Sequence, residues 1–117
     1  MKILLVGEYS RLHNSLKEGL IELGHQVTII ATGDHFKRYP VDIKLNRNFN
    51  KGFAKKLKII IYKLSKIDIT SVSIKNQFFK NKDQLKDFDI VHLINESSIG
   101  VTPKYEIEFI SFLKKHN

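Results

Sequence analysis

The sequence predicts an α/β fold in which a mostly parallel sheet carries helices on both faces. The apolar run Lys2–Val6 has the length of a strand and no polar alternation, which is typical of a strand covered on both sides. A leucine-rich helical pattern connects it to a second apolar strand at Val27–Ile30. A strand, a helix and a second strand in this order form a parallel βαβ unit, whose ligands bind at the carboxyl ends of the strands.

The first strand ends at Gly7, because glycine has no Cβ and accepts turns that other residues resist. We expect Ser10 to cap the helix that follows, and Gly24 to end it. Leucines recur along this helix at spacings that place them on one stripe, which we expect to face the sheet. The stripe consists of Leu12, Leu16, Leu20 and Leu23.

Two further strands are predicted. Thr32-Gly33-Asp34 supplies a turn after the second strand, and Val41–Leu45 alternates apolar with polar residues, as expected of a short strand near a sheet edge. Asp87–Ile94 reads as an acidic turn that leads into a buried fourth strand.

Three more helices are expected. Gly52–Lys66 has helical periodicity, and its apolar side should meet the sheet; this side consists of Phe53, Leu57, Ile60, Ile61 and Leu64. Ile67–Lys86 fits an irregular helix, weakened by the run Thr70–Ser73. Pro103 opens the last helix, whose basic C-terminal end complements the helix dipole.

The order of these elements predicts a three-layer, doubly wound, Rossmann-like sheet with strand order 3-2-1-4. The chain reverses direction between strands one and four, which creates a crevice between the loops that follow them. We interpret residues 1–117 as a single domain. Because the chain stops after a helix, where this fold would add another strand, we expect the natural protein to be longer.

The absence of cysteine excludes a disulfide framework and thiolate zinc sites, and it agrees with a cytoplasmic location. No apolar run approaches the length of about 18 residues needed to cross a bilayer. The histidines show no i, i+4 pair, so we predict no metal site, and His92 is read as a core histidine rather than a catalyst. The five are His13, His25, His35, His92 and His116.

Four segments together resemble the N-terminal half of a GT-B glycosyltransferase of the family 4 type. They are Lys2–Gly7, Leu23–Thr28, Pro40–Ile43 and Asp87–His92. The resemblance implies an acceptor-side domain of an enzyme that moves a sugar from a nucleotide-sugar donor to a saccharide or lipid-linked acceptor. It also implies that a second domain, absent here, holds the donor and its paired glutamates. The chain alone should therefore be inactive and need no other cofactor.

The crevice marks seven candidate substrate-binding residues. The first loop contributes Gly7, Glu8, Tyr9 and Ser10, and it departs from the glycine-rich loop common in the family. Its polar side chains would therefore bind sugar hydroxyls, with Tyr9 offering a stacking face. An ordinary turn with a helix cap is the alternative. The second loop contributes Asn95, Glu96 and Ser97; Glu96 either contacts an acceptor hydroxyl or caps the helix near Pro103.

Other nucleotide sites fit poorly. A dinucleotide fingerprint needs G-x-G-x-x-G, whereas this turn offers only Gly7, and no phosphate-binding P-loop sequence is present. Asp34 follows the second strand, where an acid would hold a ribose, but its place after Gly33 favours a turn.

The net charge of +8 is concentrated in one part of the chain. Residues 35–86 contain fourteen Lys or Arg against three acids, a net charge of +11, and the rest carries −3. Such a field attracts anionic partners. Lysines around two apolar residues on the outer side of the 52–66 helix suggest a peripheral contact with an anionic membrane, the alternative being a solvated face. The residues are Lys55, Lys58, Ile59, Tyr62, Lys63 and Lys66.

Nucleic acid is the other anionic partner to weigh. Aromatic residues lie among lysines in the run Phe78–Lys82, and the sequence pI is near 9.7. Only three arginines are present, and no helix-turn-helix, zinc-finger or RNP motif appears, which disfavours a nucleic-acid module.

Overall fold

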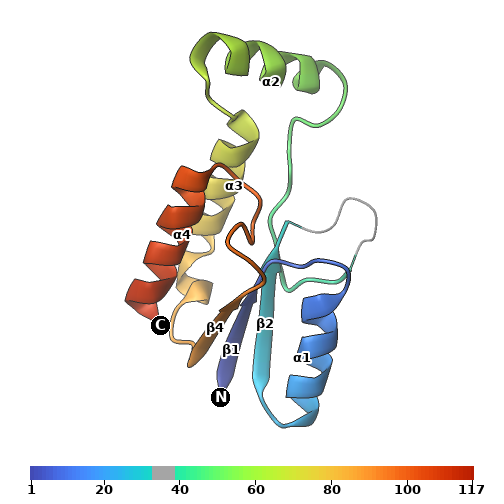
Figure 1. Cartoon of the computed structure of the whole chain (residues 1–117), viewed down its shortest axis with the longest axis vertical. Helices are drawn as coiled ribbons and strands as arrows, with labels where there is room; N and C mark the ends of the chain where they lie inside the picture. The colour runs from blue at the N-terminus through green and yellow to red at the C-terminus, as the bar shows by residue number, and fades with distance from the viewer. Residues whose placement is uncertain (33–38) are drawn as a thin grey trace.

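A four-stranded, all-parallel sheet forms the middle layer of the computed structural model, which describes residues 1–32 and 39–117 (Figure 1). The strands are β1 (Lys2–Val6), β2 (Gln26–Ala31), β3 (Ile43–Lys44) and β4 (Ile90–Leu93). Their order, β3-β2-β1-β4, confirms the predicted 3-2-1-4 sheet of a Rossmann-like fold. The predicted roles of Asp34 and His35 lie outside the described residues.

Helices cover both faces of the sheet, as predicted. Leu4 and Val6 of β1 point toward α3 (Ile69–Lys80) and α4 (Pro103–His116), where they join the larger apolar cluster. In that cluster the rings of Phe78 and Phe109 stack with centroids 4.2 Å apart. Ile3 and Leu5 belong to a second cluster on the opposite face, against which Leu20 of α1 (Leu12–Glu22) packs.

The predicted start and orientation of α1 are wrong. Ser10 does not cap the helix: Ser10 and Arg11 both have left-handed backbones, with φ of 51° and 67°, and the helix begins at Leu12. Of the leucine stripe only Leu20 packs against the sheet, while Leu12 and Leu23 are 58% and 74% exposed and Leu16 is exposed as well. His13 and Asn14 are buried in place of the leucines.

The helix α2 (Gly52–Ser65) does not meet the sheet, which corrects the second helix prediction. It lies away from the sheet at the far end of the molecule, beyond α3, and none of its residues is buried (Figure 1). The cause lies in the segment before it, which is bonded to α3 instead of the sheet. The side chain of Gln77 binds both the backbone N–H (2.7 Å) and carbonyl (2.9 Å) of Asn46, and Thr70 Oγ1 donates to the Asn48 carbonyl (3.1 Å).

The fourth strand is correctly located but is not buried. Among the residues that the structure describes, β4 has a strand neighbour only on its β1 side, so Ile90 is 43% exposed and His92 is exposed as well. The irregular helix over Ile67–Lys86 resolves into α3 and the 3-10 turn Lys82–Leu85. Within residues 1–32 and 39–117, no helix combines the length and the apolar character that a bilayer span requires.

Candidate functional site

The two loops predicted to flank the crevice lie against each other at the carboxyl edge of the sheet. Gly7 has a left-handed φ of +90°, and its N–H donates to the Ile30 carbonyl (2.8 Å). A Cβ at Gly7 would lie 2.5 Å from the Ser98 carbonyl oxygen and 2.6 Å from Ile94 Cγ2. Gly7 is therefore the point at which the loop after β1 touches the loop after β4.

Glu8 organises the first turn of α1. Its Oε2 accepts hydrogen bonds from the backbone N–H of Asn14 (2.8 Å) and from the Asn14 side-chain amide. Its Oε1 is buried and has no hydrogen-bond partner among residues 1–32 and 39–117. Tyr9 is 68% exposed and Ser10 is exposed too. The loop thus presents an open aromatic face and a hydroxyl, while the unpaired carboxylate oxygen of Glu8 is enclosed by the protein.

A pair of histidines, which the sequence reasoning did not join, ties this loop to β4. His13 is fully buried; its Nδ1 lies 2.6 Å from the Gly7 carbonyl oxygen and its Nε2 lies 3.0 Å from Nδ1 of His92. Because a carbonyl only accepts, His13 Nδ1 carries the proton, and in the neutral ring Nε2 accepts from His92. Burial lowers the pKa of His13 and His92 lowers it further, although the Gly7 carbonyl favours the charged form.

This hydrogen-bond chain also explains why two polar residues of α1, His13 and Asn14, are buried. His13 and Asn14 each bind a group of the preceding loop, and those bonds fix the rotation of the helix. A histidine in the first turn of a helix, six residues after the glycine that ends a strand, is the sequence signal that could have suggested the contact. Within the part of the chain that the structure describes, no third ligand joins the pair to form a metal-binding cluster.

The loop after β4 is held by its own side chains. Asn95 Oδ1 accepts from the Ser97 backbone N–H (2.9 Å), and Ser98 Oγ donates to the Asn95 carbonyl (2.6 Å). The Asn95 amide oxygen therefore shapes a turn, while Glu96 is exposed to solvent.

Glu106, absent from the predicted site, makes the capping contacts that were considered for Glu96. It is 5% exposed, and its Oε1 accepts from the backbone N–H groups of Gly100 (2.6 Å) and Val101 (3.1 Å) and from Ser97 Oγ (3.4 Å). A capping box places its acid at the third helical residue, whereas Glu106 is the fourth residue of α4. The sequence therefore does not match the spacing of the motif, and Glu106 was not predicted to cap the helix.

Arg47, which follows β3, closes the same edge of the sheet from the other side. Its Nη2 donates to the carbonyls of Ile99 (3.1 Å) and Gly100 (2.8 Å), and Thr32 Oγ1 donates to Ile99 as well (3.3 Å). Hydrogen bonds therefore connect the segments that follow the four strands at the carboxyl edge of the sheet.

The predicted membrane residues on α2 are mostly exposed, but they are not its most apolar side. Lys58 is partly buried, with its ammonium 3.7 Å from Asp68, and the Lys66 ammonium lies 5.6 Å from the centre of the Tyr62 ring. Two residues of the face that was expected to meet the sheet are the most open, since Phe53 and Leu64 are 80% and 83% exposed, whereas Ile61 of the same face is partly buried.

The aromatic residues of the possible nucleic-acid motif belong to the core. Phe78 is fully buried, and Phe79 packs against the same cluster with its ring edge-on to that of Phe78. The packing of these rings in the core accounts for the aromatic residues of the Phe78–Lys82 run without a role in stacking on bases.

No protein-family model, curated protein or solved structure matches this chain. The Rossmann-like fold is shown by the structure alone. The function is inferred from the sequence resemblance and from the residues at the carboxyl edge of the sheet and on α2.

Proposed function

We propose that the chain is the acceptor-side domain of a GT-B glycosyltransferase, which transfers a sugar from a nucleotide-sugar donor to a saccharide or lipid-linked acceptor. The observation that carries the proposal is the meeting of two polar loops at the point where the strand order reverses. Open sheets of this kind bind ligands at such a reversal. The loops come from the adjacent strands β1 and β4 and touch between Gly7 and Ser98.

The chemistry of the two loops suits a hydroxyl-rich ligand. Tyr9 offers an exposed ring for stacking on the apolar face of a sugar, and the exposed side chains of Ser10 and Glu96 offer hydrogen-bonding groups for its hydroxyls. Their role is to position the acceptor, because the resemblance assigns the donor and its phosphate charge to a second domain. Turnover requires that domain.

A titration with saccharides tests this proposal. We expect a ¹⁵N–¹H spectrum of the chain, titrated with a panel of mono- and disaccharides, to show shifts at residues 7–11 and 94–98. Tyr9→Ala should weaken binding by about fivefold or more, since aromatic contacts contribute about 0.5–1.5 kcal/mol beyond the area they bury. Tyr62→Ala is the matched control, because Tyr62 is also exposed but lies on α2.

Shifts confined to other parts of the chain, or equal losses from the two tyrosine variants, would refute a sugar site between these loops.

A second candidate function is contact with an anionic membrane surface, and the exposure of α2 favours it specifically. A helix of 14 residues without a buried side chain gains little stability from packing, and helices of this length are marginal alone in water. Residues 51–66 include six lysines and no acid. An apolar side bordered by lysines is the composition of a helix that lies in the lipid interface.

The exposure of the residues around α2 assigns the lipid contact to a different face of this helix from the one predicted. Ala54, Lys58 and Ile61 are the least exposed residues of α2 and mark the side toward α3. Phe53, Ile60 and Leu64 therefore form an open apolar face; we name these three residues the α2 apolar face.

Vesicle sedimentation tests the membrane contact. We expect phosphatidylcholine vesicles with phosphatidylglycerol to bind the chain at least tenfold more tightly than neutral ones, because each lysine near an anionic surface contributes about 1 kcal/mol. Phe53→Ser with Leu64→Ser should weaken binding at least tenfold, since burying one such side chain contributes about 1.5–3 kcal/mol. The control is Leu12→Ser with Leu23→Ser, which removes two exposed leucines around α1.

Equal binding to neutral and anionic vesicles would reject the electrostatic contribution. An equal loss from the two double variants would reject the α2 apolar face as the contact.

A further inference from the structure

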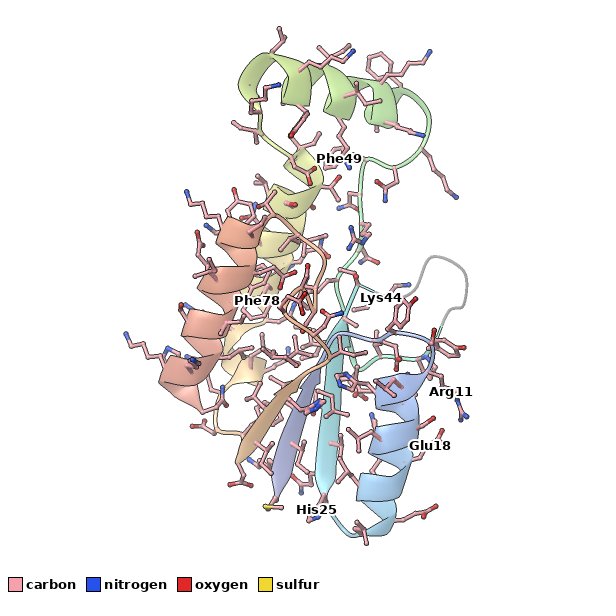
Figure 2. All side chains as sticks on the ribbon, viewed as in Figure 1. Arg11, Glu18, His25, Lys44, Phe49 and Phe78 are labelled. Carbon is pink, nitrogen blue, oxygen red and sulfur yellow. The ribbon has the colours of Figure 1, made fainter. Side chains whose placement is uncertain are left out.

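We propose that a groove between α2 and α3 binds one hydrocarbon chain of an anionic membrane lipid; this rests on the proposed membrane contact and identifies what the surface takes from the bilayer. The groove has a volume of about 720 Å³, within the range of about 300–1,000 Å³ typical of small-molecule sites. It lies where α2 joins the rest of the molecule, and Figure 2 labels Phe49 in this region, beneath α2.

The walls of the groove come from three separate parts of the chain. Phe49 contributes one wall, Leu57 and Ile61 of α2 a second, and Ile69 and Val72 of α3 a third. Apolar groups on three sides suit a flexible chain that has neither donors nor acceptors, because its burial is then driven by the hydrophobic effect alone.

The polar groups of the groove are largely bonded to one another. Ser73 Oγ accepts from the side-chain amides of Asn48 (3.0 Å) and Gln77 (3.3 Å), and Gln77 also binds the backbone of Asn46. A peptide or a nucleobase would lose hydrogen bonds to water here and find few replacements, whereas a hydrocarbon chain loses none.

Phe49 is held in an unusual conformation at this wall. Its φ of 66° is left-handed, which is an outlier for a bulky aromatic residue, and 37% of its surface is exposed. Strained residues persist where the surroundings hold them and are concentrated at ligand sites. The bonds of Asn46 and Asn48 to α3 supply that restraint.

Charge and position select a lipid of the membrane surface as the occupant. Leu57 lines the groove from the same helix that carries the α2 apolar face and the six lysines of residues 51–66. Lys80 lines the groove as well and supplies a cation from α3. A lipid whose anionic headgroup meets these lysines can place a chain against Leu57 without leaving the surface.

A tryptophan variant tests the groove directly, because the chain contains no tryptophan of its own. Asn76 is exposed on α3 and lines the groove, so Asn76→Trp should fill it and show blue-shifted indole fluorescence. Gln84→Trp is the matched control, with an exposed side chain outside the groove. The probe is dihexanoyl phosphatidylglycerol, kept monomeric below its micelle concentration.

We expect the lipid monomer to shift the ¹⁵N–¹H signals of Phe49, Leu57 and Val72 in the unmodified chain. Asn76→Trp should weaken this binding at least tenfold, and Gln84→Trp should leave it unchanged. Vesicle binding through the α2 apolar face should be retained in Asn76→Trp, which separates the two proposals.

Three results would each overturn the groove proposal. The first is vesicle binding without any shift from the lipid monomer, in which case the membrane contact stands and the groove does not. The second is a blue-shifted indole at position 76 with unchanged lipid affinity, and the third is an equal loss of affinity in Gln84→Trp.

Discussion

Replacing Gly7 with alanine should lower the free energy of unfolding by about 2–5 kcal/mol. The left-handed backbone at φ +90° costs a residue with a Cβ about 1–2 kcal/mol, and overpacking typically costs about 1–3 kcal/mol more. The overpacking arises because the new Cβ would lie 2.5 Å from the Ser98 carbonyl oxygen, and a backbone atom cannot rotate away as a side chain can. Urea unfolding followed by circular dichroism measures the change.

Gly19→Ala is the control for this result. Gly19 lies within α1, its φ is not left-handed, and nothing lies within 4 Å of the added Cβ. Alanine there should stabilise the fold by about 0.5–1 kcal/mol, because it reduces the backbone entropy lost on folding. If Gly7→Ala left stability unchanged, the two loops would not be in the contact described.

Replacing Glu106 with alanine should cost about 2–4 kcal/mol. The change removes the acceptor of the Gly100 and Val101 N–H groups, and a hydrogen bond to a charged group contributes about 1.5–3 kcal/mol. Glu106→Gln keeps an oxygen at the same position but removes the charge. It should therefore lower the free energy of unfolding by less than Glu106→Ala does. The same urea unfolding experiment measures all three proteins.

Glu108 provides the comparison within the same helix. It pairs with Lys75 at 2.6 Å, and about a third of each side chain remains exposed. Glu108→Ala should cost about 1 kcal/mol or less, as is usual for solvent-accessible ion pairs. Equal costs at the two positions would mean that Glu106 contributes only charge at the start of α4 and does not hold the loop.

The sheet could be predicted from the sequence because its signals are local. Unbroken apolar runs locate β1 and β2, and right-handed connections restrict the strand order. The predicted order already placed β4 at an edge, but the exposure of Ile90–Leu93 could not be read from this segment, because run length reports hydrophobicity and says nothing about how many neighbours a strand has.

Orientation of the helices was harder to predict, because it depends on contacts between distant residues. His13 reaches His92, 79 residues away, and this bond competes with the leucine periodicity that pointed α1 the other way. Periodicity also marks an apolar side on α2 without saying whether protein or lipid covers it. The site was predicted as two loops, but Glu106 and Arg47, which hold the second loop, come from elements that spacing could not bring to it.

The separation of α2 from both apolar clusters has a consequence for how the molecule can vary. Since none of its side chains is needed to complete the interior, the helix can fray, reform or accept substitutions at little cost to the rest of the fold. The composition of α2 is therefore constrained by the surface of the molecule and not by the packing of its interior.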